Sequence, residues 1–557
     1  MLPFAGVFKW FRQDVLRITQ QRVFALLLAV LCVVVYVPFL KNPLVFDDLN
    51  LFNNLGFIDY TFRFSLAPRW LPYATLAHTQ VMLDGSLPAM RVGNLLLHAA
   101  NVVLVFVLLY ELCIATVSGD DTKRRDVRAL VVASLGAALL ATHPVAVYGV
   151  GYLVQRTILM STLFMLLMLI AYLRWLTTGR TTLWIWSAVW YFLSVYSKEH
   201  SVAAPAVALL LTLVLHRPSI VLFRRLIAPF VAYAAIAIFV ISMVKGLLGS
   251  AYEPYALDMI QDAQDSGVNP SLAYPLSVVT QIYLYFNYMF LWVFPDVSRM
   301  SIDMREPLAS ALLAWPYWGA IAGFICYIVI AAGMLLRRGC VGLVGWILLF
   351  PCIMFATELS TVRVQEPFVL YRAYLWFPLL GALAPLALMQ LNAKVTTALA
   401  VPILCILVAL SWNRLHTLSD ALLTWEDAAK LLVTGKESGA GRIYYNRALT
   451  LSAKRRNQEA LLDLDRAVAL SPRLAPILFT RAKVNFELKR YAEALNDLGA
   501  SIALDSKQSA TYFARSIVLK RLGREDEALW DLQKSCEMKD VIACYALQQQ
   551  TKGAITK

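Results

Sequence analysis

Apolar runs long enough to cross a lipid bilayer recur through the first three quarters of this chain. The first run, at about 23–40, holds no charged side chain and follows a basic segment containing Lys9, Arg12, Arg17 and Arg22. A helix of about 20 apolar residues spans the hydrocarbon core. With 59% hydrophobic residues and a mean hydropathy of +0.63, the chain is predicted to be a polytopic membrane protein.

Basic residues predict how the runs are oriented. The formal net charge is +14, but the cations cluster in short segments between apolar runs. That pattern is typical of loops kept in the cytoplasm, so we expect no nucleic-acid partner. Residues 1–22 are expected to form a cytoplasmic interfacial helix without a cleavage site. A membrane domain over 23–416 follows, with about eleven spans, at 23–40, 91–113, 129–147, 157–176, two further runs ending near 197 and 216, 226–245, 312–336, 341–356, 371–389 and 395–412.

Two segments carry more polar residues than a lipid-facing span. Residues 272–295 are long enough to cross but include Thr280, Gln281 and Asn287. The distribution of basic residues favours a re-entrant or interfacial position for this segment over a span. The C-terminus then lies on the same side as Asp47. Residues 63–78 mix aromatic and basic residues and are expected to lie in the interface on that side.

A period of 34 residues appears after about residue 417, where the composition becomes that of a soluble helical domain. Small residues recur at the same positions of three segments, at Ala448/Ala482/Ser516 and Ala460/Ala494/Ala528. This is the tetratricopeptide pattern, in which paired helices stack into a solenoid. Repeats are predicted at about 441–474, 475–508 and 509–542, within a domain over 417–557. The expected fold is all-α, a membrane bundle followed by an α-solenoid, and the repeats either bind a protein or only act as a spacer.

Cysteine usage implies neither a zinc site nor a disulfide framework, because six of the eight cysteines lie in or beside apolar runs. Cys536 and Cys544 are the exception. They join the last two helices of the tail if that tail lies in an oxidising compartment, and otherwise they are two buried thiols. The sequence leaves both alternatives open.

Two adjacent carboxylates, Asp47 and Asp48, follow the first span directly. They are either ordinary interfacial acids, which cap a helix or pair with an arginine, or a functional pair. Asn50, Asn54 and Arg69 nearby give this loop a polar density that a plain connection does not need. A carboxylate at the water-facing end of a lipid-lined site suits base-assisted transfer from a membrane-borne donor.

Four cations lie on the side of the membrane where few are expected. They are either topology anchors or ligands of an anionic lipid phosphate. The four residues are Arg156, Lys198, Arg363 and Arg372. Asn94, His98 and Asn101 share one face of the second span, where hydrogen bonding between helices is the simpler explanation and substrate contact the alternative.

An ordered set of motifs carries a family resemblance over nearly the whole chain: FDDLN, RWLPYATLAH, MRVGNLLLHAANVVL, HPVAVYGVGYLVQRTILMSTLF, SKEHSVAAPAVALLL and LYRAYLWFP, then the repeats. This set resembles the transmembrane-and-tetratricopeptide-repeat O-mannosyltransferases and their bacterial relatives. The resemblance implies a GT-C glycosyltransferase that moves a sugar from a polyprenyl-phosphate donor to an acceptor outside the cytoplasm, with inversion. It also implies that the acidic pair supplies the catalytic carboxylate.

Roles for the site residues follow from this resemblance and from acid–base chemistry. Asp47 or Asp48 is expected to act as the base, and lipid phosphate is expected to meet Arg156, Lys198 and Arg372. The supporting residues are expected to be Arg69, His143, Glu199 and Arg363. No cofactor is expected, although a divalent cation held by the acidic pair is the alternative.

The sequence departs from the family pattern in three places. His143-Pro144 lacks the His-Thr-Glu continuation of animal members, LYRAYLWFP replaces a Glu-Arg-Tyr form, and only three repeats are present. These departures suggest a bacterial origin. With the predicted odd number of spans, a bacterial inner-membrane protein would have its site and repeats in the periplasm. The expected acceptor is a Ser/Thr hydroxyl of a protein. Alternatives are transfer to a cell-envelope glycan or lipid, and a non-enzymatic membrane scaffold that presents the repeats.

Overall fold

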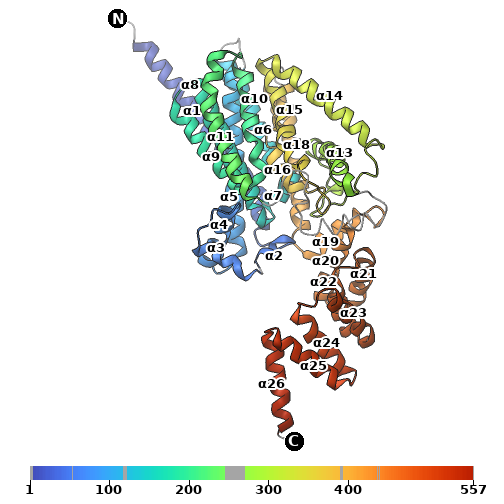
Figure 1. The fold of residues 1–557 in the computed structure, drawn as a ribbon. Helices are drawn as coiled ribbons and strands as arrows, with labels where there is room; N and C mark the ends of the chain where they lie inside the picture. Colours follow the sequence, from blue (N-terminus) through green and yellow to red (C-terminus); the bar gives the residue numbers. More distant parts are fainter. Residues whose placement is uncertain are drawn as a thin grey trace. The chain divides into compact units, whose positions relative to one another are not determined.

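The fold is known from a computed structural model, which describes residues 4–52, 54–116, 122–244, 270–388, 393–435, 437 and 439–555. These residues form helices and no strands, as predicted. The chain divides into two compact units (Figure 1). The first unit comprises residues 1–304 and 308–420, and the second comprises 305–307 and 421–557.

The first unit is a bundle of long apolar helices. Eight helices among the described residues have the length and composition of membrane spans, or nine if one bent pair counts as a single span. The eight candidate spans lie in α1 (Phe4–Tyr36), α5 (Leu87–Thr116), α8 (Arg156–Thr178), α11 (Ile220–Met243), α13 (Ala273–Val293), α14 (Tyr317–Leu336), α15 (Gly339–Leu359) and α18 (Ala393–Thr417). The bent pair is α6 (Thr122–Thr142) with α7 (Val147–Val150).

The predicted span at 371–389 is wrong. This segment forms the short helix α16 (Leu370–Trp376), a 3-10 turn at Leu380–Ala382 and the short helix α17 (Leu383–Ala387). Pro378 follows α16, and a proline lacks the N–H that would continue the helix. The broken path keeps α16 buried inside the bundle.

Four other predicted segments also differ in form. Helices α9 (Thr181–Ser197) and α10 (Ala204–Leu215) occupy the predicted fifth and sixth spans, but they are shorter than the eight candidate spans. Residues 273–293, by contrast, form one unbroken helix, α13, with the length and composition of a span. That continuity favours crossing over re-entry. Helix α1 also runs without a break from the predicted interfacial segment into the first span.

The short helices between α1 and α5 lie together at one end of the bundle, opposite the start of α1 (Figure 1). They are α2 (Asp47–Phe52), α3 (Asp59–Phe62) and α4 (Trp70–Met82). A small apolar core around Phe57, Leu76 and Leu153 joins them to the bundle. The predicted acidic pair opens α2, so this end of the first unit carries the candidate site.

The second unit stacks helices in pairs (Figure 1). After α19 (Ala421–Lys430), the pairs are α20 (Ala440–Ala453) with α21 (Asn457–Leu470), α22 (Ala475–Glu487) with α23 (Tyr491–Leu504), and α24 (Ser509–Arg521) with α25 (Glu525–Glu537). Helix α26 (Val541–Ile555) follows. In each pair an arginine of the first helix binds a buried aspartate of the second, as Arg447–Asp463, Arg481–Asp497 and Arg515–Asp531.

The turn inside each helix pair uses one left-handed residue at the same repeat position. These residues are Arg455, Lys489 and Gly523, with φ of 61°, 62° and 76°. Only glycine adopts this conformation without a steric penalty. Glycine is also the usual residue just past a helix end.

Lys489→Gly is therefore expected to stabilise the repeat unit by roughly 0.5–1 kcal/mol. Gly523→Ala is expected to destabilise it by about the same amount. Hydrogen exchange of α22 to α25 in the full-length protein measures both changes. If Lys489→Gly accelerates exchange, the conformational argument for this turn fails.

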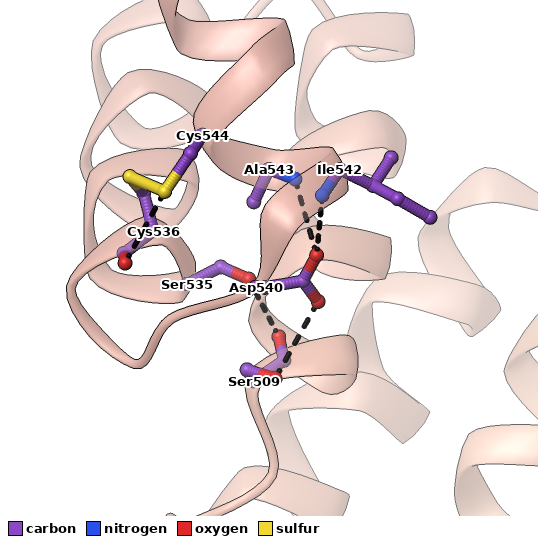
Figure 2. The surroundings of a disulfide bond; sticks show 7 residues. All are labelled: Ser509, Ser535, Cys536, Asp540, Ile542, Ala543 and Cys544. Atoms are coloured by element: carbon purple, nitrogen blue, oxygen red, sulfur yellow. Dashed lines mark hydrogen bonds between the residues drawn. A yellow bond between two sulfur atoms is a disulfide. The ribbon is translucent and has the colours of Figure 1, made fainter.

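A disulfide joins the last two helices of the second unit, which settles the alternative left open by the sequence. Cys536 and Cys544 are bonded, with their Cα atoms 4.6 Å apart. Figure 2 shows how the intervening turn brings them together, with Asp540 accepting hydrogen bonds from the Ile542 and Ala543 N–H groups at the start of α26. The six other cysteines are free thiols.

Candidate functional site

The predicted acidic pair divides into two different environments. Asp48 is fully buried, and its carboxylate accepts hydrogen bonds from the N–H groups of Val154 at 2.8 Å, Leu153 at 3.4 Å and Val45 at 3.5 Å. Burial raises the pKa of Asp48 to about 7, against the lowering effect of the Val154 bond and of Arg91. Asp48 therefore fastens α2 to the turn before α8.

Asp47 is only half-buried and faces two tyrosines. Its N–H donates to the Tyr152 hydroxyl at 2.9 Å, and the Tyr152 and Tyr371 rings meet edge to face, 6.2 Å apart. Burial, followed by the nearby carboxylates of Glu366 and Asp47, raises the pKa of the Tyr371 phenol well above its ordinary value. Asp47 is therefore the more accessible carboxylate of the pair.

A second cluster surrounds Glu358, a carboxylate at the end of α15 that is 1% exposed. Its oxygens lie 2.8 Å from Arg372 Nη1, 3.2 Å from Arg363 Nε and 3.1 Å from His200 Nε2. One buried carboxylate thus holds three basic side chains in place. Two of them, Arg363 and Arg372, are predicted site residues, which the structure brings together.

Sequence reasoning did not select Glu358 or Glu366 as site residues. Glu366 accepts hydrogen bonds from the Tyr371 hydroxyl and from Arg372 Nη2, each at 3.3 Å, and so connects the tyrosines beside Asp47 to the arginine cluster. The sequence did contain a signal for them: Glu358 lies at the end of an apolar run, and Glu366 follows eight residues later. Only the fold shows which cations these carboxylates meet.

Arg69 and Glu199 form an ion pair on the same side of the unit. Arg69 Nε donates to Glu199 Oε2 at 3.0 Å, and a second contact joins Arg69 Nη2 to Oε1. His200 Nδ1 lies 3.4 Å from Glu199 Oε1, so the His200 ring stands between Glu199 and Glu358. The predicted residues Arg69 and Glu199 thus join the Glu358 cluster through His200.

Lys198 is the cation of this region without a direct partner. It is 7% exposed, and its ammonium forms no hydrogen bond or ion pair with any described residue. Burial, together with the charge of Arg69, lowers the pKa of Lys198 to about 7. Arg372 acts in the same direction, whereas the carboxylates of Glu199 and Glu366 raise the pKa, so the buried ammonium lies among charges of both signs.

Arg156 holds the fold together and lies outside the Glu358 cluster. Its guanidinium donates to Asn94 Oδ1 at 2.9 Å, to the Met90 carbonyl at 2.7 Å and to Thr75 Oγ1 at 3.3 Å. A Cβ added at Gly93 would lie 2.5 Å from Arg156 Nη2, so the glycine of the MRVGN motif makes room for this side chain. These neutral partners leave its positive charge uncompensated.

His143, a predicted supporting residue, makes its contacts outside the Glu358 cluster. The imidazole stacks on Trp292, with ring centroids 4.2 Å apart, and its Nε2 lies 3.1 Å from the Trp292 carbonyl. Nδ1 accepts from the Val145 N–H and caps the turn that follows α6. Both nitrogens thus have structural partners, which explains why a histidine precedes Pro144.

The polar face of α5 makes contacts between segments, as the simpler explanation predicted. Asn94 donates to the Val150 and Leu153 carbonyls, and Asn101 donates to the Leu159 carbonyl at 3.0 Å. His98 Nδ1 lies 2.8 Å from the Tyr374 hydroxyl. Tyr374 belongs to α16, which also carries Arg372, so these contacts fix the helix on which a site arginine stands.

No group of three or more His, Cys, Asp and Glu side chains suited to hold a metal ion occurs among the residues that the structure describes. The carboxylates of this end bind backbone N–H groups, arginines, a histidine and a tyrosine instead. The expectation of a metal-free site stays a prediction.

These observations define a class: an all-α protein that combines helices suited to span a membrane with a unit of 34-residue helical repeats. No family model matches the chain. No curated protein matches it either.

Solved structures resemble about a quarter of the chain. Two crystal structures of MamA are 19% and 18% identical, cover 24% and 28% of this chain and 71% and 82% of their own, and give TM-scores of 0.20. YrrB, a TPR protein with an unusual peptide-binding site, is 19% identical, covers 28% of this chain and 87% of its own, and gives 0.21. TM-scores this low carry no argument about the fold. The evidence for the repeat fold is the 34-residue period of the sequence and the pairing of helices α20 to α25.

Proposed function

We propose that this protein is a membrane-embedded, inverting glycosyltransferase of the GT-C type. It transfers a sugar from a polyprenyl-phosphate donor to a Ser/Thr hydroxyl of a protein on the side of the membrane where Asp47 lies. The motif order in the sequence supports this reading. The observation that carries it is a buried ammonium, Lys198, which forms no direct ion pair and lies among arginines and glutamates at the same end of the bundle as a partly exposed carboxylate, Asp47.

The proposed chemistry is a single displacement at the anomeric carbon. The acceptor oxygen forms the new glycosidic bond as the bond from the anomeric carbon to the phosphate oxygen breaks. Asp47 takes the acceptor's proton. The departing lipid phosphate keeps the electron pair of the broken bond, and Lys198 with Arg372 stabilises its charge.

Asp48 and Glu358 serve as positioning residues in this proposal. Asp48 holds the start of α2 through three backbone N–H groups, and Asp47 is its neighbour on that helix. Glu358 fixes Arg363 and Arg372 before the donor arrives, so little reorganisation is needed during transfer.

The second unit supports a protein acceptor or partner, since stacked helical repeats present extended surfaces for peptides and helices. Its disulfide is typical of an oxidising compartment such as the periplasm. We propose accordingly that the repeats and the site face the periplasm.

The test is transfer by the purified full-length protein in nanodiscs. Radiolabelled polyprenyl-phosphate sugars, mannose first, are offered with Ser/Thr peptides, or with cell-envelope glycans and lipids. Labelled peptide supports the proposal. Labelled glycan or lipid would instead support a transferase that modifies the cell envelope. No transfer from any donor, with proteins still captured by the repeats, contradicts an enzyme and leaves the scaffold.

Donor binding is expected to weaken as pH rises through about 7. Lys198 is protonated below its lowered pKa and neutral above it, whereas a phosphodiester stays anionic across this range. The KM for donor is measured between pH 6 and 9. Lys198→Arg keeps its charge and should flatten the profile at a low KM, while Lys198→Met should flatten it at the high KM that the unaltered protein reaches near pH 9. An unchanged profile in Lys198→Met removes this lysine from the site.

A further inference from the structure

The segment that links α3 to α4 exposes large apolar side chains outside every candidate span. Phe62 is 73% exposed, Phe64 is 71% exposed, and Leu66 is also exposed. The helix ends at Phe62, and the backbone at Arg63 is extended, with φ of −119° and ψ of 117°. In an extended chain alternate side chains share a side. The extended Arg63 therefore places Phe62 and Phe64 on one side, and these two side chains with the exposed Leu66 are here called the 62–66 edge.

Specific contacts hold this segment against the end of α9. The Tyr196 hydroxyl donates to the Ser65 carbonyl, and the Arg69 N–H donates to the Tyr196 carbonyl at 2.7 Å. The Trp70 indole N–H donates to the Arg63 carbonyl at 2.8 Å, and the Trp70 ring meets Phe64 edge to face. The exposed edge is thus part of a fixed structure.

The helix beside this edge belongs to the apolar bundle. Helix α9 packs along α8, a candidate span, and exposes Ile185, Trp186 and Val189. The Tyr196 contacts fix the 62–66 edge at the C-terminal end of the same helix. Exposed apolar groups fixed at the end of a helix of an apolar bundle are most simply covered by lipid.

We propose that Phe62, Phe64 and Leu66 insert into the membrane leaflet on the side of Asp47 and so anchor the loop that carries Arg69. Arg69 has a left-handed backbone, with φ of 67°, a conformation that persists in a non-glycine residue only where the surroundings enforce it. Three features hold Arg69 in this conformation. They are the lipid-inserted edge before it, its backbone hydrogen bond to Tyr196 and its ion pair with Glu199. The anchor thus ties the Glu199–His200 side of the cluster to the bilayer surface.

Site-directed spin labelling tests insertion without any reference to transfer. Single cysteines are introduced by Phe62→Cys, Arg63→Cys, Phe64→Cys, Ser65→Cys and Leu66→Cys, in a background with Cys326→Ser, Cys340→Ser and Cys405→Ser. The protein is placed in nanodiscs of phosphatidylcholine and phosphatidylglycerol. Collision with oxygen, which partitions into lipid, is compared with collision with a water-soluble nickel chelate.

The expected result is a two-residue period. Labels at 62, 64 and 66 should favour oxygen, and labels at 63 and 65 should favour nickel. Preference for nickel at all five positions would overturn the proposal, because the edge would then lie in water. Low collision with both reagents would also overturn it, because protein would then cover the edge.

A second arm asks whether the anchor matters for the site, and it rests on the proposed function. Phe62→Ser combined with Phe64→Ser should raise the KM for donor with a smaller effect on kcat, because Arg69 and its partner Glu199 lose support. Val433→Ser, at an exposed apolar side chain of the second unit, is the control and should leave both unchanged. If the labels show insertion but transfer is absent in the unaltered protein, the anchor stands and the proposed function fails. If KM does not move, the link from the anchor to the site is overturned.

Discussion

Asp47→Asn is expected to lower the rate of sugar transfer by roughly 10²- to 10⁴-fold, the usual contribution of a general base. Asn keeps the size of the side chain but cannot take the acceptor's proton. The side chain is half-buried, and the backbone N–H of residue 47 still donates to the Tyr152 hydroxyl after the substitution. The Asp47 side chain also bonds to the Tyr152 hydroxyl, and the amide oxygen of Asn can accept that bond, so folding should change little. The measurement is kcat for transfer together with the melting temperature in nanodiscs.

A matched control for this variant lies in the same loop. Asp59→Asn removes an exposed carboxylate at the start of α3 and should leave both transfer and melting unchanged. Full activity in Asp47→Asn would assign the base elsewhere. Glu366 would be the next residue to test, since it also lies beside Tyr371.

Asp48→Ala is expected to destabilise the first unit by about 3 kcal/mol or more, whether or not the protein is an enzyme. The change leaves three buried backbone N–H groups without their acceptor, and each unmet group costs roughly 1–3 kcal/mol. It also removes the carboxylate whose charge acts on Arg91, whose guanidinium otherwise meets only carbonyl oxygens. Thermal unfolding in nanodiscs measures the loss, and Asp59→Ala is the control.

The pH dependence of unfolding gives a second readout for Asp48. Its pKa in the folded protein, about 7, lies above the ordinary value, so the folded state holds a proton that the unfolded chain has released. The stabilisation from this proton is present at low pH and is lost as pH rises through 7. That decline should be absent in Asp48→Ala. A variant as stable as the unaltered protein would show that the buried bonds of Asp48 matter little.

Local pattern was enough to find the helices and the repeats. Long uncharged runs have few alternatives to a membrane helix, and a 34-residue period leaves little choice but paired helices. The same reasoning failed at 371–389. The mean apolarity of this segment is that of a span, but Pro378 follows the end of α16 and the chain continues as two short turns.

Within the candidate site, the sequence named most of the residues that meet but not what each one does. Asp47 and Asp48 are neighbours of the same type, and only burial separates them. His143 has the composition of a site residue, yet it stacks on Trp292, which lies 149 positions away in the chain. Glu358 is important because it contacts three basic side chains that lie elsewhere in the chain, His200, Arg363 and Arg372.

By itself, the sequence determined an all-α chain with helices suited to a membrane and a tail of paired helical repeats, because both depend on periodicity within a short window. The tertiary structure alone decided which carboxylate is buried, which lysine lacks a partner and which cysteines bond. These properties depend on desolvation and on contacts between distant segments. Neither is encoded in the order of neighbouring residues.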